Sequence, residues 1–254
     1  MILRRLGNKA NMANEIQKHF PRHQIYIEPF FGAGGMFFNK PKSNCNIVND
    51  IDSEVFNLFN VVSNRKSELE EMFLQTPKHQ DLFNYWKETQ ETDPIRKAMR
   101  FLFISNYTFM GAGASLKLNS RNDVKQLYSG LQKVNEKLFE VQFANVDFRQ
   151  FFKSISIEKQ EIEKTFIYCD PPYIETMDNY SHSFTEIDSN DLFDCLQETD
   201  CKFAMSEFNH PFILEQAKQR NLNVITIGER QNLKNRRTEI LVTNYKNHAT
   251  LFDF

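Results

Sequence analysis

The residues best suited to chemistry are the consecutive Asp170, Pro171, Pro172 and Tyr173, an acid, two prolines and an aromatic ring. They follow the apolar run 166–169, which predicts a buried strand, so they stand where open α/β sheets bind ligands. Each proline fixes its own φ and restricts the residue before it, which makes this backbone rigid. Such a turn can hold a carbonyl oxygen and a carboxylate as acceptors for a planar NH2 group, while Tyr173 stacks on its ring.

A glycine-rich loop follows a second predicted strand, at 25–27, and contains Phe30, Gly32 and Gly34. Glycines after a first strand let the backbone approach a ligand closely. The nicotinamide fingerprint G-x-G-x-x-G is excluded because its third glycine would fall on Phe37. The P-loop is excluded as well, because no Gly-Lys-Ser/Thr follows. The loop is therefore not expected to hold a pyrophosphate.

An acid ends the next apolar run, 46–49, and such an acid commonly accepts hydrogen bonds from ribose hydroxyls. We assign this role to Asp50 because it terminates the run directly. Asp52, followed by Ser53, resembles the cap of the next helix. Simple capping remains an alternative for both acids.

The elements that position these residues alternate along the chain. Strands are predicted at 25–28, 46–49, 141–145, 166–169, 202–206, 223–227 and 239–245. Helices are predicted between most of them, at 12–19, 55–62, 191–197 and 211–220. This alternation indicates an α/β fold with a mainly parallel sheet and helices on both faces.

Between residues 63 and 137 the alternation stops, and the sequence predicts an inserted helical subdomain. Its helices are expected at 66–74, 80–88, 93–104 and 124–138. The predicted domains are thus a catalytic part at 1–62, the insert at 63–137 and a second catalytic part at 138–254. Within the insert, the loop residues Asn106, Tyr107 and Lys117 could reach base edges or phosphates, unless they form an ordinary interhelical loop.

Charge and composition narrow the class of protein. The 254 residues carry a net charge of -2, yet the start is basic and a second basic cluster precedes the last strand, at Arg230, Lys234, Arg236 and Arg237. Basic clusters on an acidic background fit a localised phosphate-binding face, and a solvated charged loop is the alternative. No apolar run has the length of a membrane span, and the four cysteines lack C-x-x-C spacing. We expect a cytoplasmic protein with free thiols and no metal site.

The glycine loop together with the D-P-P-Y residues resembles the Dam-type adenine-specific DNA methyltransferases. The similarity extends to 7–9 and 19–21 near the start and to 239–245 near the end. It implies a Rossmann-like sheet that binds S-adenosylmethionine, with the last strand inserted antiparallel. It also implies that the helical insert recognises the target DNA.

The resemblance assigns these residues to S-adenosylmethionine: Lys9, Phe30, Gly32, Gly34, Asp50, Asp147, Phe148 and Asp170. Phe30 and the two glycines would hold the methionine end, and Lys9 would pair with its carboxylate. Asp50 would bind the ribose. Asp147 would accept from the adenine amine, and Phe148 would pack on its ring.

The implied reaction methylates the exocyclic N6 amine of a flipped-out adenine in double-stranded DNA. The catalytic residues would be Asp170, Pro171, Pro172 and Tyr173. The Asp170 carboxylate and the Pro171 carbonyl would accept the two amine protons, and Tyr173 would stack on the base. Tyr180 and Phe184 are weaker candidates for closing the site.

Other acceptors and partners stay open at this point. RNA adenine or a protein glutamine amide could replace DNA adenine, although protein amide methylators usually carry Asn where this chain has Asp170. A catalytically silent nucleic-acid-binding regulator is the third possibility. The chain lacks the R-x-N-x-x-G-x-F-N-x-P-x-G-like run of relatives that read GATC, so GATC is not predicted. A cognate restriction endonuclease is a possible partner.

Overall fold

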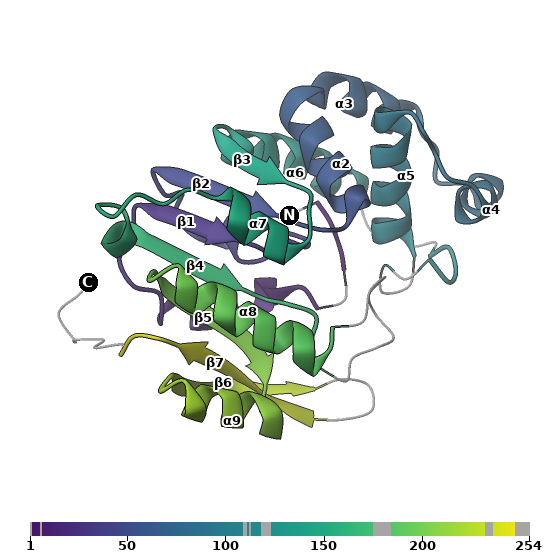
Figure 1. Ribbon diagram of the computed structural model, residues 1–254. Helices are drawn as coiled ribbons and strands as arrows, with labels where there is room; N and C mark the ends of the chain where they lie inside the picture. The colour runs from purple at the N-terminus through teal and green to yellow at the C-terminus, as the bar shows by residue number, and fades with distance from the viewer. Residues whose placement is uncertain are drawn as a thin grey trace.

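The computed structural model describes residues 2–5, 7–108, 111, 113–117, 123–174, 184–231 and 236–246. Its centre is a seven-stranded sheet in the order β3-β2-β1-β4-β5-β7-β6 (Figure 1). The strands are β1 (Ile25–Glu28), β2 (Cys45–Asn49), β3 (Val141–Ala144), β4 (Thr165–Cys169), β5 (Lys202–Phe208), β6 (Asn223–Gln231) and β7 (Arg236–Thr243). β7 is antiparallel to both β5 and β6, and the other pairs are parallel. The predicted α/β sheet with an antiparallel last strand is confirmed.

Two layers of helices cover the sheet (Figure 1). The helices are α1 (Ala13–Gln17), α2 (Ser53–Asn64), α3 (Lys66–Gln75), α4 (Gln80–Glu88), α5 (Pro94–Tyr107), α6 (Asp123–Leu138), α7 (Phe148–Ser154), α8 (Glu186–Glu198) and α9 (Pro211–Gln219), with 3-10 turns at Lys9–Asn11, Phe37–Asn39 and Ile162–Lys164. Successive strand residues point to opposite faces. Tyr26 and Phe166 therefore pack with α1, α2 and α6, whereas Ile27 and Ile167 pack with α7, α8 and α9.

The helical insert shares its hydrophobic core with one face of the sheet. Leu131 and Val134 of α6 belong to the same buried cluster as Phe59 of α2 and Val48 of β2. α4 projects farthest from the sheet (Figure 1). The stretch from α3 to α6 is helical as expected, with one isolated bridge between Thr108 and Leu116. Its boundaries at 63 and 137 stay a prediction.

The main difference from the expected elements is α7, which the hydrophobic pattern did not indicate. It is only seven residues long, and its N-cap is Asp147, whose side chain accepts from the Arg149 N–H at 2.9 Å. β6 and β7 also begin or end several residues beyond their expected bounds, and a register shift lies between Thr226 and Gly228. In the described part of the chain, no helix is long and apolar enough to cross a membrane.

Candidate active site

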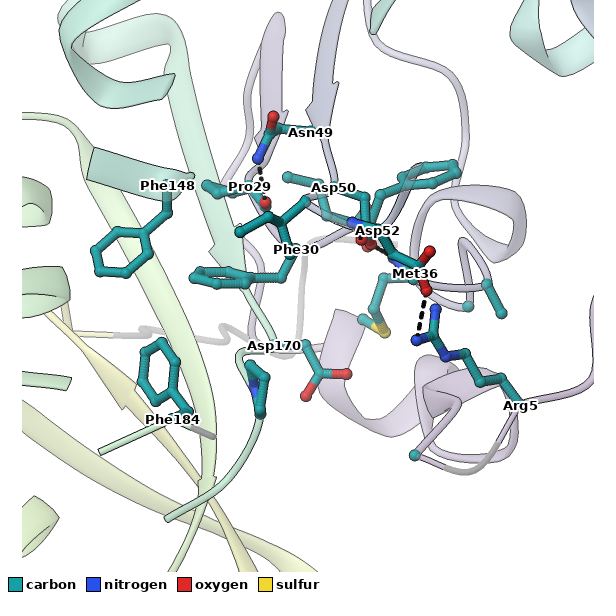
Figure 2. A pocket seen from close by; sticks show the side chains of 18 of the residues that line it. Arg5, Pro29, Phe30, Met36, Asn49, Asp50, Asp52, Phe148, Asp170 and Phe184 are labelled. Atoms are coloured by element: carbon teal, nitrogen blue, oxygen red, sulfur yellow. Dashed lines mark hydrogen bonds and ion pairs between the residues drawn. The ribbon is translucent and has the colours of Figure 1, made fainter. Parts of the chain in front are cut away.

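A cavity of about 270 Å3 lies where β1, β2, β3 and β4 end (Figure 2). Parallel strands carry their carboxyl ends to one edge of a sheet, so segments far apart in the sequence meet there. The cavity brings together most of the residues expected to bind a cofactor: Lys9, Phe30, Gly32, Asp50, Asp147, Phe148 and Asp170. Pro172 and Phe184 line it too.

Asp50 ties the glycine loop to the end of β2. One carboxylate oxygen accepts from the Gly32 N–H at 2.6 Å, and the other accepts from the Asp52 N–H at 2.9 Å. Burial raises the pKa of the Asp50 carboxyl. Gly32 has a positive φ of 53°, and a Cβ added there would meet nothing within 4 Å. Because Gly32 lines the cavity, a side chain at this position would project into open space.

Three aromatic rings form one end of the cavity, as Figure 2 shows. The Phe30 ring lies 5.6 Å from Phe148 and 6.0 Å from Phe184, and the last two are 5.9 Å apart, measured between ring centres. The Arg149 guanidinium lies 4.3 Å from the centre of the Phe148 ring. Phe30 was expected at the methionine end, but its ring groups with Phe148, the residue expected on the adenine. Which end of the cofactor Phe30 contacts stays a prediction.

Asp170 belongs to a buried ionic cluster beside the cavity. The Lys9 ammonium is 2.8 Å from an Asp170 oxygen and 3.3 Å from a Glu239 oxygen, although its side chain is only 3% exposed. The same ammonium lies 4.4 Å from the centre of the Tyr173 ring. Asp170 itself remains 20% exposed and faces the cavity. Lys9 thus has two carboxylate partners inside the protein.

Tyr173 packs inward from the D-P-P-Y turn. Its hydroxyl donates to Glu239, and its ring meets Phe208 edge-on at 4.6 Å. The side chain is 7% exposed and does not line the cavity. Stacking of Tyr173 on a target base therefore stays a prediction.

Two more carboxyl groups are buried nearby. Glu28 ends β1 and lines the cavity, and burial raises its pKa to about 8 even though the Tyr26 hydroxyl donates to it at 2.8 Å. Burial also raises the pKa of Glu207, which accepts from the Phe208 N–H at 2.8 Å. Glu28 was not singled out from the sequence, yet an acid at a strand end was the signal that found Asp50 and Asp170.

Gly34 does not line the cavity, which corrects its expected place in the cofactor pocket. A Cβ added at Gly34 would fall 2.3 Å from the Phe38 ring and 2.9 Å from the Phe31 ring. Gly35 lines the cavity instead, and an added Cβ there would lie 2.2 Å from the Asn8 side-chain oxygen. Sequence spacing alone does not show which of two adjacent glycines faces the cavity, because this depends on the backbone conformation of the folded loop.

The three insert residues expected to contact DNA differ in their exposure to solvent. Asn106 donates its amide to the Ile2 and Leu102 carbonyls at 2.8 and 2.9 Å. Tyr107 is 4% exposed and packs edge-on against Phe103. These contacts lie within the protein and do not support the expected roles on DNA, which stay predictions. Lys117 is exposed, and its role on DNA stays a prediction.

Arg237 lies close to the D-P-P-Y residues. Its guanidinium is 5.3 Å from the centre of the Phe208 ring, which in turn contacts Tyr173. The side chains of Arg230 and Arg236, and the whole of Lys234 and Tyr180, lie outside the described residues. No group of three or more metal-binding side chains occurs among the residues that the structure describes.

Two cavity-lining arginines were not predicted from the sequence as site residues. Arg149 pairs with Asp188 at 2.6 Å and with Asp191 at 2.7 Å, which ties α7 to α8. Arg5 pairs with Asp52 at 2.8 Å at the end of the cavity away from the aromatic rings (Figure 2). Both arginines are held in place by contacts between segments that are distant in the sequence. Local sequence patterns therefore gave no signal for them.

The sequence is similar to those of known DNA methyltransferases. The chain is 28% identical to the DNA adenine methylase of Escherichia coli (strain K12) over 182 residues, which are 68% of this chain and 64% of that protein. The match thus spans just under two thirds of that relative's length. The type II methyltransferase M1.LlaDCHI of Lactococcus lactis subsp. cremoris is 26% identical over 95% of this chain and 94% of its own.

Among solved structures, the chain is similar to the rRNA methyltransferase aviRa from Streptomyces viridochromogenes, at 10% sequence identity and a TM-score of 0.39. The superposition covers 92% of this chain and 84% of that protein. A likeness of this size does not indicate a shared substrate. The family comparison covers nearly the whole chain. Residues 6–247 match the D12 class N6 adenine-specific DNA methyltransferases, and the chain belongs to that family.

Proposed function

We propose that this protein transfers a methyl group from S-adenosylmethionine to the N6 amine of an adenine in double-stranded DNA. One observation carries the proposal, namely that a single cavity joins the aromatic end to Asp170 in a chain of this family. The cavity suits the cofactor, because it offers aromatic faces for a purine, the Asp50 carboxylate for ribose hydroxyls, and open space above Gly32.

The proposed chemistry places most of the work on positioning. The sulfonium of S-adenosylmethionine supplies an already activated methyl group. The lone pair of the adenine amine is delocalised into the ring, so acceptors for both amine protons would favour the nucleophilic form. The Asp170 carboxylate and the Pro171 carbonyl would serve as these acceptors, and Lys9 would fix the Asp170 side chain through its 2.8 Å ion pair.

The remaining assignments follow from where the side chains lie. Phe30, Phe148 and Phe184 would enclose the cofactor's adenine, and Asp147 would accept from its amine. Asp147 already caps α7 with one oxygen, and its second oxygen lies 3.4 Å from Arg149. A carboxylate accepts several hydrogen bonds, so this arrangement leaves capacity for an amine.

The test uses the purified protein with methyl-labelled S-adenosylmethionine and three acceptors, which are mixed-sequence duplex DNA, RNA and a protein extract. We expect label in DNA, at adenine N6, and none above background with Asp170→Ala. Label in RNA or protein instead would support one of the other acceptors. Cofactor binding without transfer to any polymer would support the silent regulator and contradict the proposal.

The recognition site and the partners extend this proposal. Sequencing of DNA from cells that express the protein would map the methylated positions, and we do not expect GATC. The name of the Lactococcus lactis relative, a type II methyltransferase, supports a cognate restriction endonuclease as a partner. The proposed DNA substrate supports the cytoplasm as the place of action. Methylated DNA that remains sensitive to every endonuclease encoded beside the gene would contradict that partnership.

A further inference from the structure

The aromatic end of the cavity is tied together by one side chain, Arg149. Its guanidinium lies 4.3 Å from the centre of the Phe148 ring. Its three nitrogens each contact a carboxylate, namely Asp191 at 2.7 Å, Asp188 at 2.6 Å and Asp147 at 3.4 Å. These partners lie at the start of α7 and on α8, so Arg149 joins separate segments at this end of the cavity.

We infer that Arg149 is a positioning residue for the cofactor, which fixes the aromatic wall in the arrangement that encloses a purine. The inference rests on the proposed function, because it takes the adenine of S-adenosylmethionine as the group that Phe148 and Phe184 enclose. Arg149 would act through the side chains assigned to the adenine and not on the adenine itself. It contacts Phe148 and Asp147 directly, and it reaches Phe184 through the cap of α8.

The first link holds the Phe148 ring. Phe148 and Arg149 are the first two residues of α7, and a cation over an aromatic face is attracted by the charge distribution of the ring. Because α7 has only seven residues, it is too short to be stable without packing. The direction of the Phe148 ring therefore depends on what Arg149 binds on the neighbouring helix.

The second link holds Phe184. One Asp188 oxygen contacts Arg149, and the other accepts from the Thr185 N–H at 2.8 Å and from its hydroxyl at 2.6 Å. These bonds belong to the capping box that begins α8, and Phe184 directly precedes Thr185. One carboxylate thus anchors the start of α8 and receives Arg149. This connection fixes the rings of Phe148 and Phe184 relative to each other, with 5.9 Å between their centres.

Three carboxylates converge on this one guanidinium. Without the cation, Asp147 at the start of α7 would be repelled by Asp188 and Asp191 on α8. A lysine would restore the charge but not the planar fork that contacts several carboxylates at once. Loss of Arg149 would therefore loosen both rings, and a ligand would have to order them when it binds, which lowers its affinity.

Arg220 offers a matched control on the same helix. It contacts Asp194 at 2.6 Å and Asn190 at 2.9 Å, both on α8, and its guanidinium lies 5.4 Å from the centre of the Phe193 ring. Unlike Arg149, it does not line the cavity. Arg220→Gln therefore removes a comparable set of contacts to α8 and the same charge, and it leaves the aromatic wall in place.

Isothermal titration of the DNA-free protein compares S-adenosylhomocysteine with 5′-methylthioadenosine, which shares its adenine but lacks the amino-acid end. In Arg149→Gln we expect both nucleosides to bind about five- to fiftyfold more weakly, by the same factor, because two side chains must be ordered on binding. The affinities of Arg149→Lys should lie between those of this variant and the parent. Arg220→Gln should bind both nucleosides within twofold of the parent.

Steady-state kinetics of labelled methyl transfer to duplex DNA give a second measurement. In Arg149→Gln the KM for S-adenosylmethionine should rise, while the rate at saturating cofactor should fall by less than threefold, because Asp170 is held by Lys9. A loss of folding stability alone would not produce this split. Denaturant unfolding of each variant shows that it is folded.

A milder variant covers the case in which Arg149→Gln does not fold. Asp191→Asn removes the charge of one of the three partners, on a side chain that is 40% exposed, and such surface changes cost little stability. It should weaken both nucleosides by the same factor, with a smaller change than Arg149→Gln.

Three results would overturn the inference while the proposed function stands. They are parent-like affinity in Arg149→Gln, equal losses in Arg149→Gln and Arg220→Gln, and a loss confined to S-adenosylhomocysteine. A parent protein that binds neither nucleoside overturns the cofactor assignment of the proposed function, and this inference with it.

Discussion

The cavity and the segment 106–117 of the insert differ in how well their polar residues converge. Asn106 and Tyr107 were expected in a loop, but they form the last turn of α5. In the cavity, acids from the ends of β1, β2 and β4 line one space of about 270 Å3. In the segment 106–117, the polar residues diverge. Tyr107 is buried, whereas Lys117 is exposed.

The difference arises from what holds each side chain. A parallel sheet fixes the carboxyl ends of its strands at one edge, so a residue at a strand end has a predictable place. A loop residue takes its direction from whichever helix or turn it packs against. Residues at strand ends therefore justify functional assignments from sequence better than polar residues in a loop.

The largest effect is expected at the cavity's acid, Asp170. Asp170→Ala should lower the turnover of labelled methyl transfer by about a hundredfold or more, the size seen when one group that stabilises a transition state is lost. Affinity for S-adenosylhomocysteine should change little, because the aromatic end and Asp50 remain. Single-turnover kinetics and titration measure the two quantities.

Asp170→Asn is the control for size, since it keeps the side-chain volume and removes the charge beside Lys9. A large loss in this variant too would assign the effect to the charge. Turnover of Asp170→Ala within threefold of the parent would show that the carboxylate has no such role.

Two glycines in one loop offer a sharper contrast, because both have a positive φ, 53° at Gly32 and 69° at Gly34. Both substitutions by Leu share the backbone strain. Gly32→Leu should lower the affinity for S-adenosylhomocysteine by about tenfold or more, which corresponds to a loss of about 1.4 kcal/mol or more in binding free energy. Gly34→Leu should instead lower the free energy of unfolding by about 1–3 kcal/mol, because its side chain enters the Phe31 and Phe38 rings.

Chemical denaturation and titration of the two variants give both quantities. The cavity geometry would be contradicted if Gly34→Leu were as stable as the parent but unable to bind the nucleoside.

Glu28 should make stability depend on pH. Its pKa is about 8 in the folded protein because of burial, against an ordinary value of 4.5 when unfolded. The folded state therefore holds a proton that the unfolded state releases. The stabilisation is complete below about pH 4.5 and is lost as the pH rises to about 8, by about 1.4 kcal/mol for each unit of pKa difference.

Denaturant unfolding between pH 5 and 9 measures this loss. In Glu28→Gln, which keeps an acceptor for the Tyr26 hydroxyl, the parent's decline should be reduced. Parallel curves for parent and variant would mean that Glu28 titrates normally.

The smallest effect concerns the segment 106–117. Lys117→Gln should lower the affinity for duplex DNA by a few-fold. It should also reduce the salt dependence of binding by the amount that corresponds to about one phosphate contact. Tyr107→Phe should leave DNA affinity unchanged, because the ring is buried. Fluorescence anisotropy at several salt concentrations compares them. A stronger effect of Tyr107→Phe than of Lys117→Gln would reverse our reading of this segment.

The sequence by itself determined the α/β class, the strand positions and most of the cavity. Apolar runs that end in Asp50 and Asp170 are local signals, and their convergence follows from a parallel sheet. The capping role of Asp52 was also predictable from its neighbours. The short helix α7 was missed because seven residues give too little periodicity.

The tertiary structure alone decided which charged residues are available to a ligand. Lys9 is enclosed by Asp170 and Glu239, which lie 161 and 230 positions away in the chain, whereas Arg5 reaches the cavity beside Asp52. It also decided that Gly35, and not Gly34, faces the cavity. Burial and ion pairing depend on segments distant in sequence, and no local pattern records them.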